Sequence, residues 1–116
     1  MKVLVVDDDV DLLRMLEKLL VHRGHEVHSC ATPFGVSAIV LRERPEVVVL
    51  DMMMPGLSGA DLAELVQKLE LTPPPKMVLW SAMNPDELAE EGTRLGLPVV
   101  SKTQRPSHLI DFLEKL

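Results

Sequence analysis

The sequence predicts an α/β fold in which helices cover both faces of a five-stranded parallel sheet. Short, continuous apolar runs recur along the chain, and segments with helical periodicity separate them. Such runs are typical of strands buried on both faces, and strands that alternate with helices form parallel sheets with right-handed crossovers. We therefore expect a three-layer (βα)5 sandwich with the flavodoxin-like strand order 2-1-3-4-5.

In the first part of the chain, each predicted element has its own local signal. The apolar run 3–6 predicts a strand, and leucines at helical spacing over 12–20 predict the helix that follows it. A second strand is expected over 26–31. Thr32 then resembles an N-cap, with proline at the first helical position, and predicts a helix over 33–42.

The second part continues the alternation to the end of the chain. A strand over 47–50 leads through a Pro-Gly turn to a helix over 58–70, which Ser58 can cap. A strand over 77–80 precedes Asn84, where an N-cap, a first-turn proline and an acidic residue predict a helix start. The last two predicted elements are a strand at 99–100 and a helix from Ser107 to Leu116.

Length and composition restrict the classes of protein. With 116 residues, the chain is expected to be one domain, 1–116. A net charge of −6 argues against direct nucleic-acid binding, which needs clustered Lys and Arg. Cys30 is the only cysteine, so an internal disulfide is excluded. The chain has no signal-peptide pattern and no apolar run long enough for a membrane span, and we expect a cytoplasmic location.

Polar residues follow four of the predicted strands. Asp7 and Asp8 follow the first strand, and Asp51 closes the third. Ser81 follows the fourth strand, and Lys102 comes just after the fifth. Because ligands of open α/β sheets bind at the carboxyl ends of the strands, we expect these side chains to share one crevice.

The acidic residues of this crevice point to a divalent cation. Carboxylates that lie close together resist ionisation unless a positive charge sits among them. Mg²⁺ prefers oxygen ligands and commonly uses one or two carboxylates together with phosphate oxygens. The alternative role for the run Asp7-Asp8-Asp9 is helix capping, which we assign to Asp9.

Asp51 can act as a nucleophile toward phosphorus and form an aspartyl phosphate. The transferred group is strongly negative, so its transfer depends on positioning and counter-charge. Lys102 can supply a point charge, and the Ser81 hydroxyl and the Ala82 amide can donate hydrogen bonds to phosphoryl oxygens. The sequence therefore predicts a site for Mg²⁺ and a phosphoryl group.

Along nearly its whole length, the chain resembles the receiver domain of two-component response regulators, including the chemotaxis regulators. The segments that carry the resemblance are 5–8, 51–56, 81–82 and Lys102, and Ser81 follows Asp51 by thirty residues as the family pattern expects.

The resemblance implies a signalling switch that catalyses its own phosphotransfer and dephosphorylation, rather than an enzyme with a separate substrate. Asp51 would accept phosphate from a sensor histidine kinase or a phosphotransfer protein, and Ser81 and Lys102 would sense it. The signal would pass to the face formed by the fourth helix, fifth strand and fifth helix. The output partner and oligomeric state stay open, a homodimer on phosphorylation being one alternative. The implied Mg²⁺ ligands are Asp7, Asp8, Asp51 and the Met53 carbonyl.

The chain departs from the family pattern next to Lys102. Val99 stands where the family usually has an aromatic residue, and Thr103 stands where it usually has proline. We therefore hypothesise that the fourth helix, loosened by Gly92, carries much of the conformational change. In the family, the positions of Met53 and Met83 flank the entry path of the water that hydrolyses the aspartyl phosphate. Two apolar side chains there predict a long-lived phosphoryl group.

Three other functions are alternatives to a phosphorylated receiver domain. The first is a pseudo-receiver, an interaction module with the same fold that is not regulated by phosphorylation. The second is a phosphatase of the haloacid dehalogenase type, which would need an Asp at the position of Met53. The third, a flavin-binding flavodoxin, is disfavoured because acids occupy the first loop.

Overall fold

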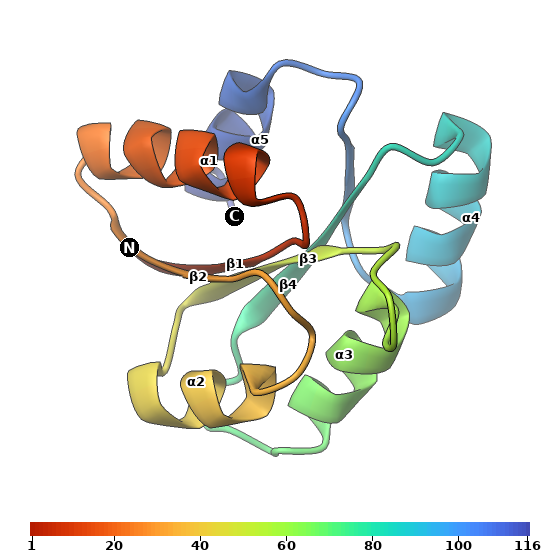
Figure 1. Cartoon of the computed structure of the whole chain (residues 1–116). Coiled ribbons are helices and arrows are strands. Elements are labelled where there is room, and N and C mark those ends of the chain that lie inside the picture. Colours follow the sequence, from red (N-terminus) through yellow and green to blue (C-terminus); the bar gives the residue numbers. More distant parts are fainter.

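The computed structural model describes residues 1–116 and contains one sheet of five parallel strands (Figure 1). The strand order, β2-β1-β3-β4-β5, confirms the predicted order. The strands are β1 (Lys2–Val6), β2 (Glu26–Cys30), β3 (Val47–Asp51), β4 (Lys76–Ser81) and β5 (Val99–Ser101).

Five helices complete a three-layer sandwich. Helices α1 and α5 cover one face of the sheet, and α2, α3 and α4 lie against the other (Figure 1). None of them is long and apolar enough to cross a membrane. The helices are α1 (Val10–His22), α2 (Val36–Glu43), α3 (Gly59–Gln67), α4 (Pro85–Leu95) and α5 (Pro106–Glu114).

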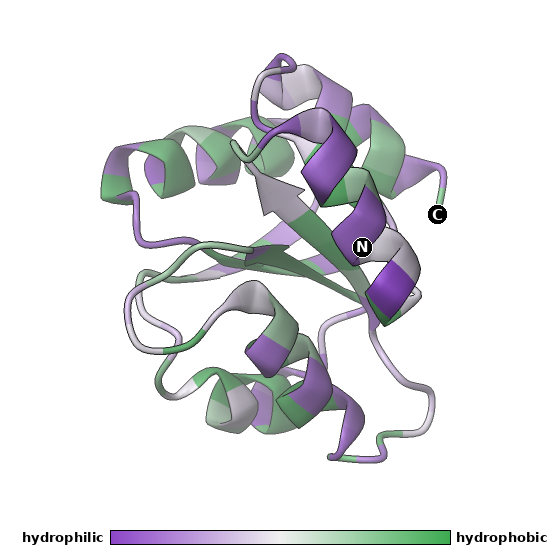
Figure 2. Ribbon diagram, turned by 90° about the vertical axis from the view of Figure 1, so that its right-hand side faces the viewer, coloured by the Kyte–Doolittle hydropathy of each residue, from purple (hydrophilic) through white to green (hydrophobic).

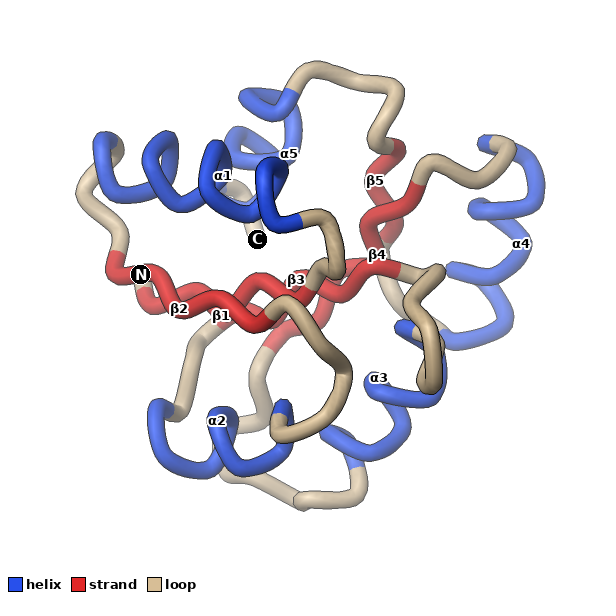
Figure 3. Tube along the Cα trace, in the orientation of Figure 1, coloured by secondary structure: helices blue, strands red, loops and turns tan.

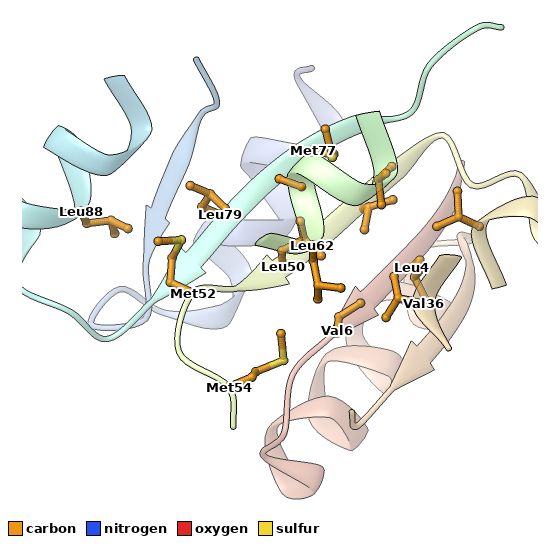
Figure 4. Close-up of a cluster of buried hydrophobic side chains, with 14 residues drawn as sticks. Leu4, Val6, Val36, Leu50, Met52, Met54, Leu62, Met77, Leu79 and Leu88 are labelled. Atoms are coloured by element: carbon orange, nitrogen blue, oxygen red, sulfur yellow. The ribbon is translucent and has the colours of Figure 1, made fainter. Parts of the chain in front are cut away.

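The core is divided into two apolar clusters by the sheet. Successive side chains of a strand point to opposite faces, so Val3 and Val5 pack under α1 and α5 whereas Leu4 and Val6 pack over α2 and α3. Figure 4 shows the second cluster. In Figure 2 the central strands are largely hydrophobic, and the helices alternate hydrophobic and hydrophilic bands. Burial on both faces is what the continuous apolar runs predicted.

Three of the predicted helix starts are confirmed by their capping bonds. Asp9 Oδ1 accepts a hydrogen bond from the Leu12 amide at the start of α1. Ser58 and Asp61 form a capping box at the start of α3, and Asn84 caps α4. These bonds satisfy amide groups that have no partner inside the helix.

Two helix boundaries were predicted wrongly. Thr32 does not cap α2: its hydroxyl accepts a hydrogen bond from the Phe34 amide in a turn, and the helix begins at Val36. Helix α3 ends at Gln67, three residues before the predicted end, and Glu70 adopts a left-handed backbone conformation with φ of 51°. In both places local turns compete with the helix.

Gly92 has a packing role that its sequence position did not reveal. A Cβ atom at this position would lie 2.6 Å from Val99 Cγ1 and 2.9 Å from the Leu97 carbonyl oxygen. Glycine therefore allows α4 to lie close against β5. Gly92 was expected only to loosen α4, but it lies where this helix packs tightly against β5.

A cluster of surface charges joins the carboxyl ends of α1 and α5. Arg23 Nη1 lies 2.6 Å from Asp111 Oδ1 and 2.7 Å from Glu114 Oε1. His25 Nε2 lies 2.8 Å from Glu114 Oε2. We refer to Arg23, His25, Asp111 and Glu114 as the α1–α5 charge cluster.

Candidate functional site

The predicted site residues converge where parallel strands end. Val6 pairs with Leu50 in the register of β1 and β3, so the residues that follow β1 emerge beside Asp51. Ser81 pairs with Ser101 in the register of β4 and β5. The segments after these strands leave the same edge of the sheet (Figure 3).

Asp7 is the most deeply buried acid of the site, with no exposed surface. Its Oδ1 accepts a hydrogen bond from the Asp9 amide at 2.9 Å. Its Oδ2 is buried without a hydrogen-bond donor in a favourable direction, although Lys102 Nζ lies only 2.7 Å away. A buried carboxylate oxygen with an unused lone pair can still take a cation.

Asp51 is almost as buried, with 4% of its surface exposed. Oδ1 accepts a hydrogen bond from the Met53 amide at 3.2 Å and lies 3.3 Å from Lys102 Nζ. Desolvation raises the pKa of Asp51 from 3.8 to about 6; the Asp7 carboxylate adds to this, while the Met53 amide and Lys102 oppose it. The protein groups engage Oδ1 and leave Oδ2 without a protein partner.

Lys102 is the one cation among these acids. Its amide donates a hydrogen bond to the Ser81 carbonyl at 2.7 Å, which fixes the backbone beyond β5 against the end of β4. Its Nζ bridges Asp7 and Asp51 and lies 5.0 Å from the centre of the Trp80 ring. The ammonium group is thus held by two carboxylates and an aromatic face.

The site carries more negative than positive charge. Carboxylate oxygens of Asp7, Asp8 and Asp51 lie within 4.8 Å of one another, whereas Lys102 supplies one positive charge. Asp8 is exposed and has no hydrogen-bonded partner on its side chain. Clustered carboxylate oxygens and unbalanced negative charge fit a hard divalent cation such as Mg²⁺.

Three polar groups near the acids remain available to a ligand. The Ala82 amide donates no hydrogen bond within the chain, and the Met53 carbonyl accepts none. The Ser81 oxygen accepts a hydrogen bond from the Met83 amide at 3.1 Å, so its hydroxyl hydrogen is not used in that bond. All three belong to the set that the sequence identified.

Gly59 is a positioning residue that the sequence analysis missed. A Cβ atom there would lie 2.5 Å from the Asp51 carbonyl oxygen, and its amide donates to the Met52 carbonyl at 3.2 Å. The first turn of α3 therefore packs directly on the chain at Asp51. The available signal was a glycine immediately after the Ser58 cap.

The two methionines beside the site differ in exposure. The surface of Met53 is 66% exposed, whereas Met83 is partly buried against the apolar cluster under α4. Met53 does not form a closed apolar cover over Asp51. A slow loss of the phosphoryl group therefore stays a prediction that depends on the absence of a polar group at these positions.

Comparisons with known proteins all point to response regulators. The family model described as "Response regulator receiver domain" matches residues 3–114. The phosphate regulon transcriptional regulatory protein PhoB of Pseudomonas aeruginosa is 26% identical over 97% of this chain and 49% of its own length. The transcriptional regulatory protein AfsQ1 of Streptomyces coelicolor is 29% identical over 72% of the chain and 36% of its own length. The chain thus spans half or less of these relatives.

Solved structures show the same fold. The receiver domain of NtrX from Brucella abortus has a TM-score of 0.85 at 28% identity and covers 97% of this chain and 95% of that one. The chemotaxis response regulator CheY4 of Vibrio cholerae has a TM-score of 0.87 at 24% identity, with 98% and 96% coverage. The acids, the lysine and the hydroxyl described above thus lie on a fold shared with these proteins.

Proposed function

The chain belongs to the response regulator receiver domain family, and from that premise we propose that Asp51 accepts a phosphoryl group from a phosphohistidine. The donor would be a sensor histidine kinase or a phosphotransfer protein. The observation that carries the proposal is the arrangement of Asp51, which is buried, carries a raised pKa and lies 3.3 Å from Lys102 Nζ. Perturbed carboxylates of this kind concentrate at functional sites.

In the proposed step, Asp51 Oδ2 forms a bond to phosphorus while the phosphorus–nitrogen bond of the phosphohistidine breaks. The electron pair of the broken bond stays on the imidazole nitrogen. Oδ2 is the oxygen available for attack because the Met53 amide and Lys102 engage Oδ1. The pKa of about 6 leaves Asp51 mostly ionised at neutral pH, as a nucleophile requires.

The remaining residues would bind and neutralise the transferred group. Lys102 is close enough to Asp51 to pair with a new phosphoryl charge, and the free Ala82 amide and the Ser81 hydroxyl can donate hydrogen bonds. Mg²⁺, when bound, would supply positive charge against the phosphoryl oxygens. Its proposed ligands are Asp7, Asp8, Asp51 and the Met53 carbonyl.

We infer that the output passes through α4, β5 and α5. Lys102 directly follows β5, and Gly92 brings α4 into contact with Val99 of that strand. A shift of Lys102 toward a phosphoryl group would therefore act on β5 and on the helix that lies against Val99. The downstream partner is an output domain or protein, and the proposed setting is the cytoplasm.

Labelling by a small acyl phosphate tests the proposal. With Mg²⁺ present, the intact protein should gain the mass of one phosphoryl group, and the gain should be absent in Asp51→Asn or when the metal is chelated. Arg23→Gln, in the α1–α5 charge cluster, is the matched control and should label normally. A wild-type protein that folds and binds Mg²⁺ but never labels would favour the pseudo-receiver.

A further inference from the structure

The seven methionines of this chain differ widely in exposure, with Met1 and Met83 partly buried. Met53 has 66% of its surface exposed, and Met15 on α1 has 38%. Met52, Met54 and Met77 are buried, with at most 8% of their surface exposed, and Figure 4 shows all three inside the cluster of buried side chains. Met53 is therefore the thioether most open to dissolved oxidants, and its two neighbours in sequence are shielded from them.

Met53 also lies beside the proposed phosphoacceptor. Its amide donates the 3.2 Å hydrogen bond to Asp51 Oδ1. Its side chain borders an open depression of about 450 Å³ together with Met52, Met54, Pro55 and Ser58. The Met53 backbone is therefore tied to Asp51, two residues earlier in the chain, and its exposed side chain can change chemically without rearrangement of the core.

We propose that Met53 is a reversible oxidation site that sets the lifetime of the phosphoryl group; the lifetime effect rests on the proposed function. A peroxide transfers one oxygen atom to the Met53 sulfur. The sulfur–oxygen bond forms as the oxygen–oxygen bond of hydrogen peroxide breaks, the sulfur gives up two electrons, and the peroxide leaves as water. The product is a sulfoxide, which thiol-dependent reductases can return to the thioether.

The oxidation replaces an apolar group by a strong hydrogen-bond acceptor. The Met53 thioether is only a weak hydrogen-bond acceptor, whereas a sulfoxide oxygen can accept a strong hydrogen bond from a water molecule. Water that attacks phosphorus breaks the bond to the Asp51 oxygen and yields the carboxylate and dihydrogen phosphate. A sulfoxide at Met53 that binds this water raises the hydrolysis rate by roughly two- to tenfold, the range expected for one added neutral hydrogen bond.

Peptide mapping tests the modification site without any phosphorylation. The folded protein is treated with dilute hydrogen peroxide, and fragment masses give the rate of oxygen addition at each methionine. Met53 should be oxidised several-fold faster than Met15 and well before Met52 or Met54. Equal rates at Met53 and Met15, or faster oxidation of the buried methionines, would overturn the proposal.

Phosphoryl decay before and after peroxide tests the consequence. The decay rate of acyl-phosphate-labelled wild type should rise after treatment, and it should stay constant in Met53→Leu, which cannot be oxidised at this position. Met15→Leu should respond as wild type does. Met53→Gln carries a permanent acceptor and should decay faster than Met53→Leu without peroxide.

Failure of the inference about Met53 can be distinguished from failure of the proposed function. If the untreated wild type labels normally but treated and untreated proteins decay at the same rate, the inference about Met53 is wrong and the proposed function stands. If the untreated protein does not label at all, the proposed function fails, and the lifetime effect fails with it.

Discussion

The acid site and the α1–α5 charge cluster contain the same kinds of side chain but hold them in opposite ways. The acid site lies at the start of α1 and the cluster at its end, joined to α5. Asp7 and Asp51 are buried around Lys102, with more acids than cations. In the cluster the carboxylates lie at the surface, and two basic side chains, Arg23 and His25, face the two carboxylates of Asp111 and Glu114.

The pKa values move in opposite directions in the two regions. A hydrogen bond from Arg23 lowers the pKa of Asp111, and bonds from His25 and then Arg23 lower the pKa of Glu114. Desolvation raises the pKa of Asp51 instead. The α1–α5 charge cluster therefore stabilises the ionised form of its carboxyl groups. The acid site destabilises the ionised form of Asp51, and a bound divalent cation would offset this effect.

The largest effect is expected when Lys102 is removed. Lys102→Ala leaves Asp7 and Asp51 buried without a counter-charge, and the free energy of unfolding in metal-free buffer at pH 7.5 should fall by about 3–5 kcal/mol. Chemical denaturation measures the loss, and added Mg²⁺ should restore part of it. A loss no greater than that of Arg23→Gln would break the distinction between the two regions.

The next effect concerns the charge of Asp51 and has a defined pH dependence. Because its pKa is 3.8 unfolded and about 6 folded, the folded state binds the proton more tightly. The resulting stability is present below pH 3.8 and is lost as the pH rises through about 6, an effect of at most about 3 kcal/mol.

Asp51→Asn should therefore be more stable than wild type at pH 8 in metal-free buffer, and the difference should shrink toward pH 4. Denaturation curves at a series of pH values measure it. A difference that stays constant across this range would show that the Asp51 carboxylate is not destabilised by the fold.

A smaller effect is expected at the contact between α4 and β5, and it tests whether this contact contributes to stability independently of the charged residues of the acid site. Gly92→Ala would normally strengthen a helix, but the 2.6 Å approach to Val99 Cγ1 should reverse the sign and cost about 1–3 kcal/mol. Val99→Ala should recover part of this loss in the double variant. The Mg²⁺ response should not change. A Gly92→Ala protein more stable than wild type would rule out the tight contact.

The smallest effect is expected in the α1–α5 charge cluster. Arg23→Gln removes exposed ion pairs to Asp111 and Glu114, so the loss of stability should be slight and should nearly vanish in about 1 M salt, where charges are screened within a few ångströms. The loss from Lys102→Ala should persist in the same salt because that pair is buried. Equal salt sensitivity of the two variants would contradict the comparison.

The sequence was sufficient for the fold and for the meeting of the acids, because both follow from strand order. Once β1 and β3 are neighbours, Asp7 and Asp8 must emerge beside Asp51. The helix starts at Asp9, Ser58 and Asn84 were also predictable, since each depends on local capping bonds.

Features that depend on tertiary contacts could not be predicted from the sequence. The start of α2 failed because Thr32 forms a turn with Phe34 instead of a cap. The tight approach at Gly92 depends on where Val99 lies across the gap between α4 and β5. The raised pKa of Asp51 depends on the burial of its carboxylate and on the charge of Asp7 nearby, and residue spacing alone shows neither of them.

Fluorescence of Trp80 tests most directly whether the unbalanced acid site takes up a cation and a phosphoryl group. Trp80 is the only tryptophan, is buried, and has Lys102 Nζ 5.0 Å from its ring centre. Titration with Mg²⁺ followed by beryllofluoride, a phosphoryl mimic, should give saturable changes in wild type and in Arg23→Gln, and the beryllofluoride change should be lost in Asp51→Asn. Identical responses in wild type and Asp51→Asn, or no saturable response in either protein, would contradict the proposed site.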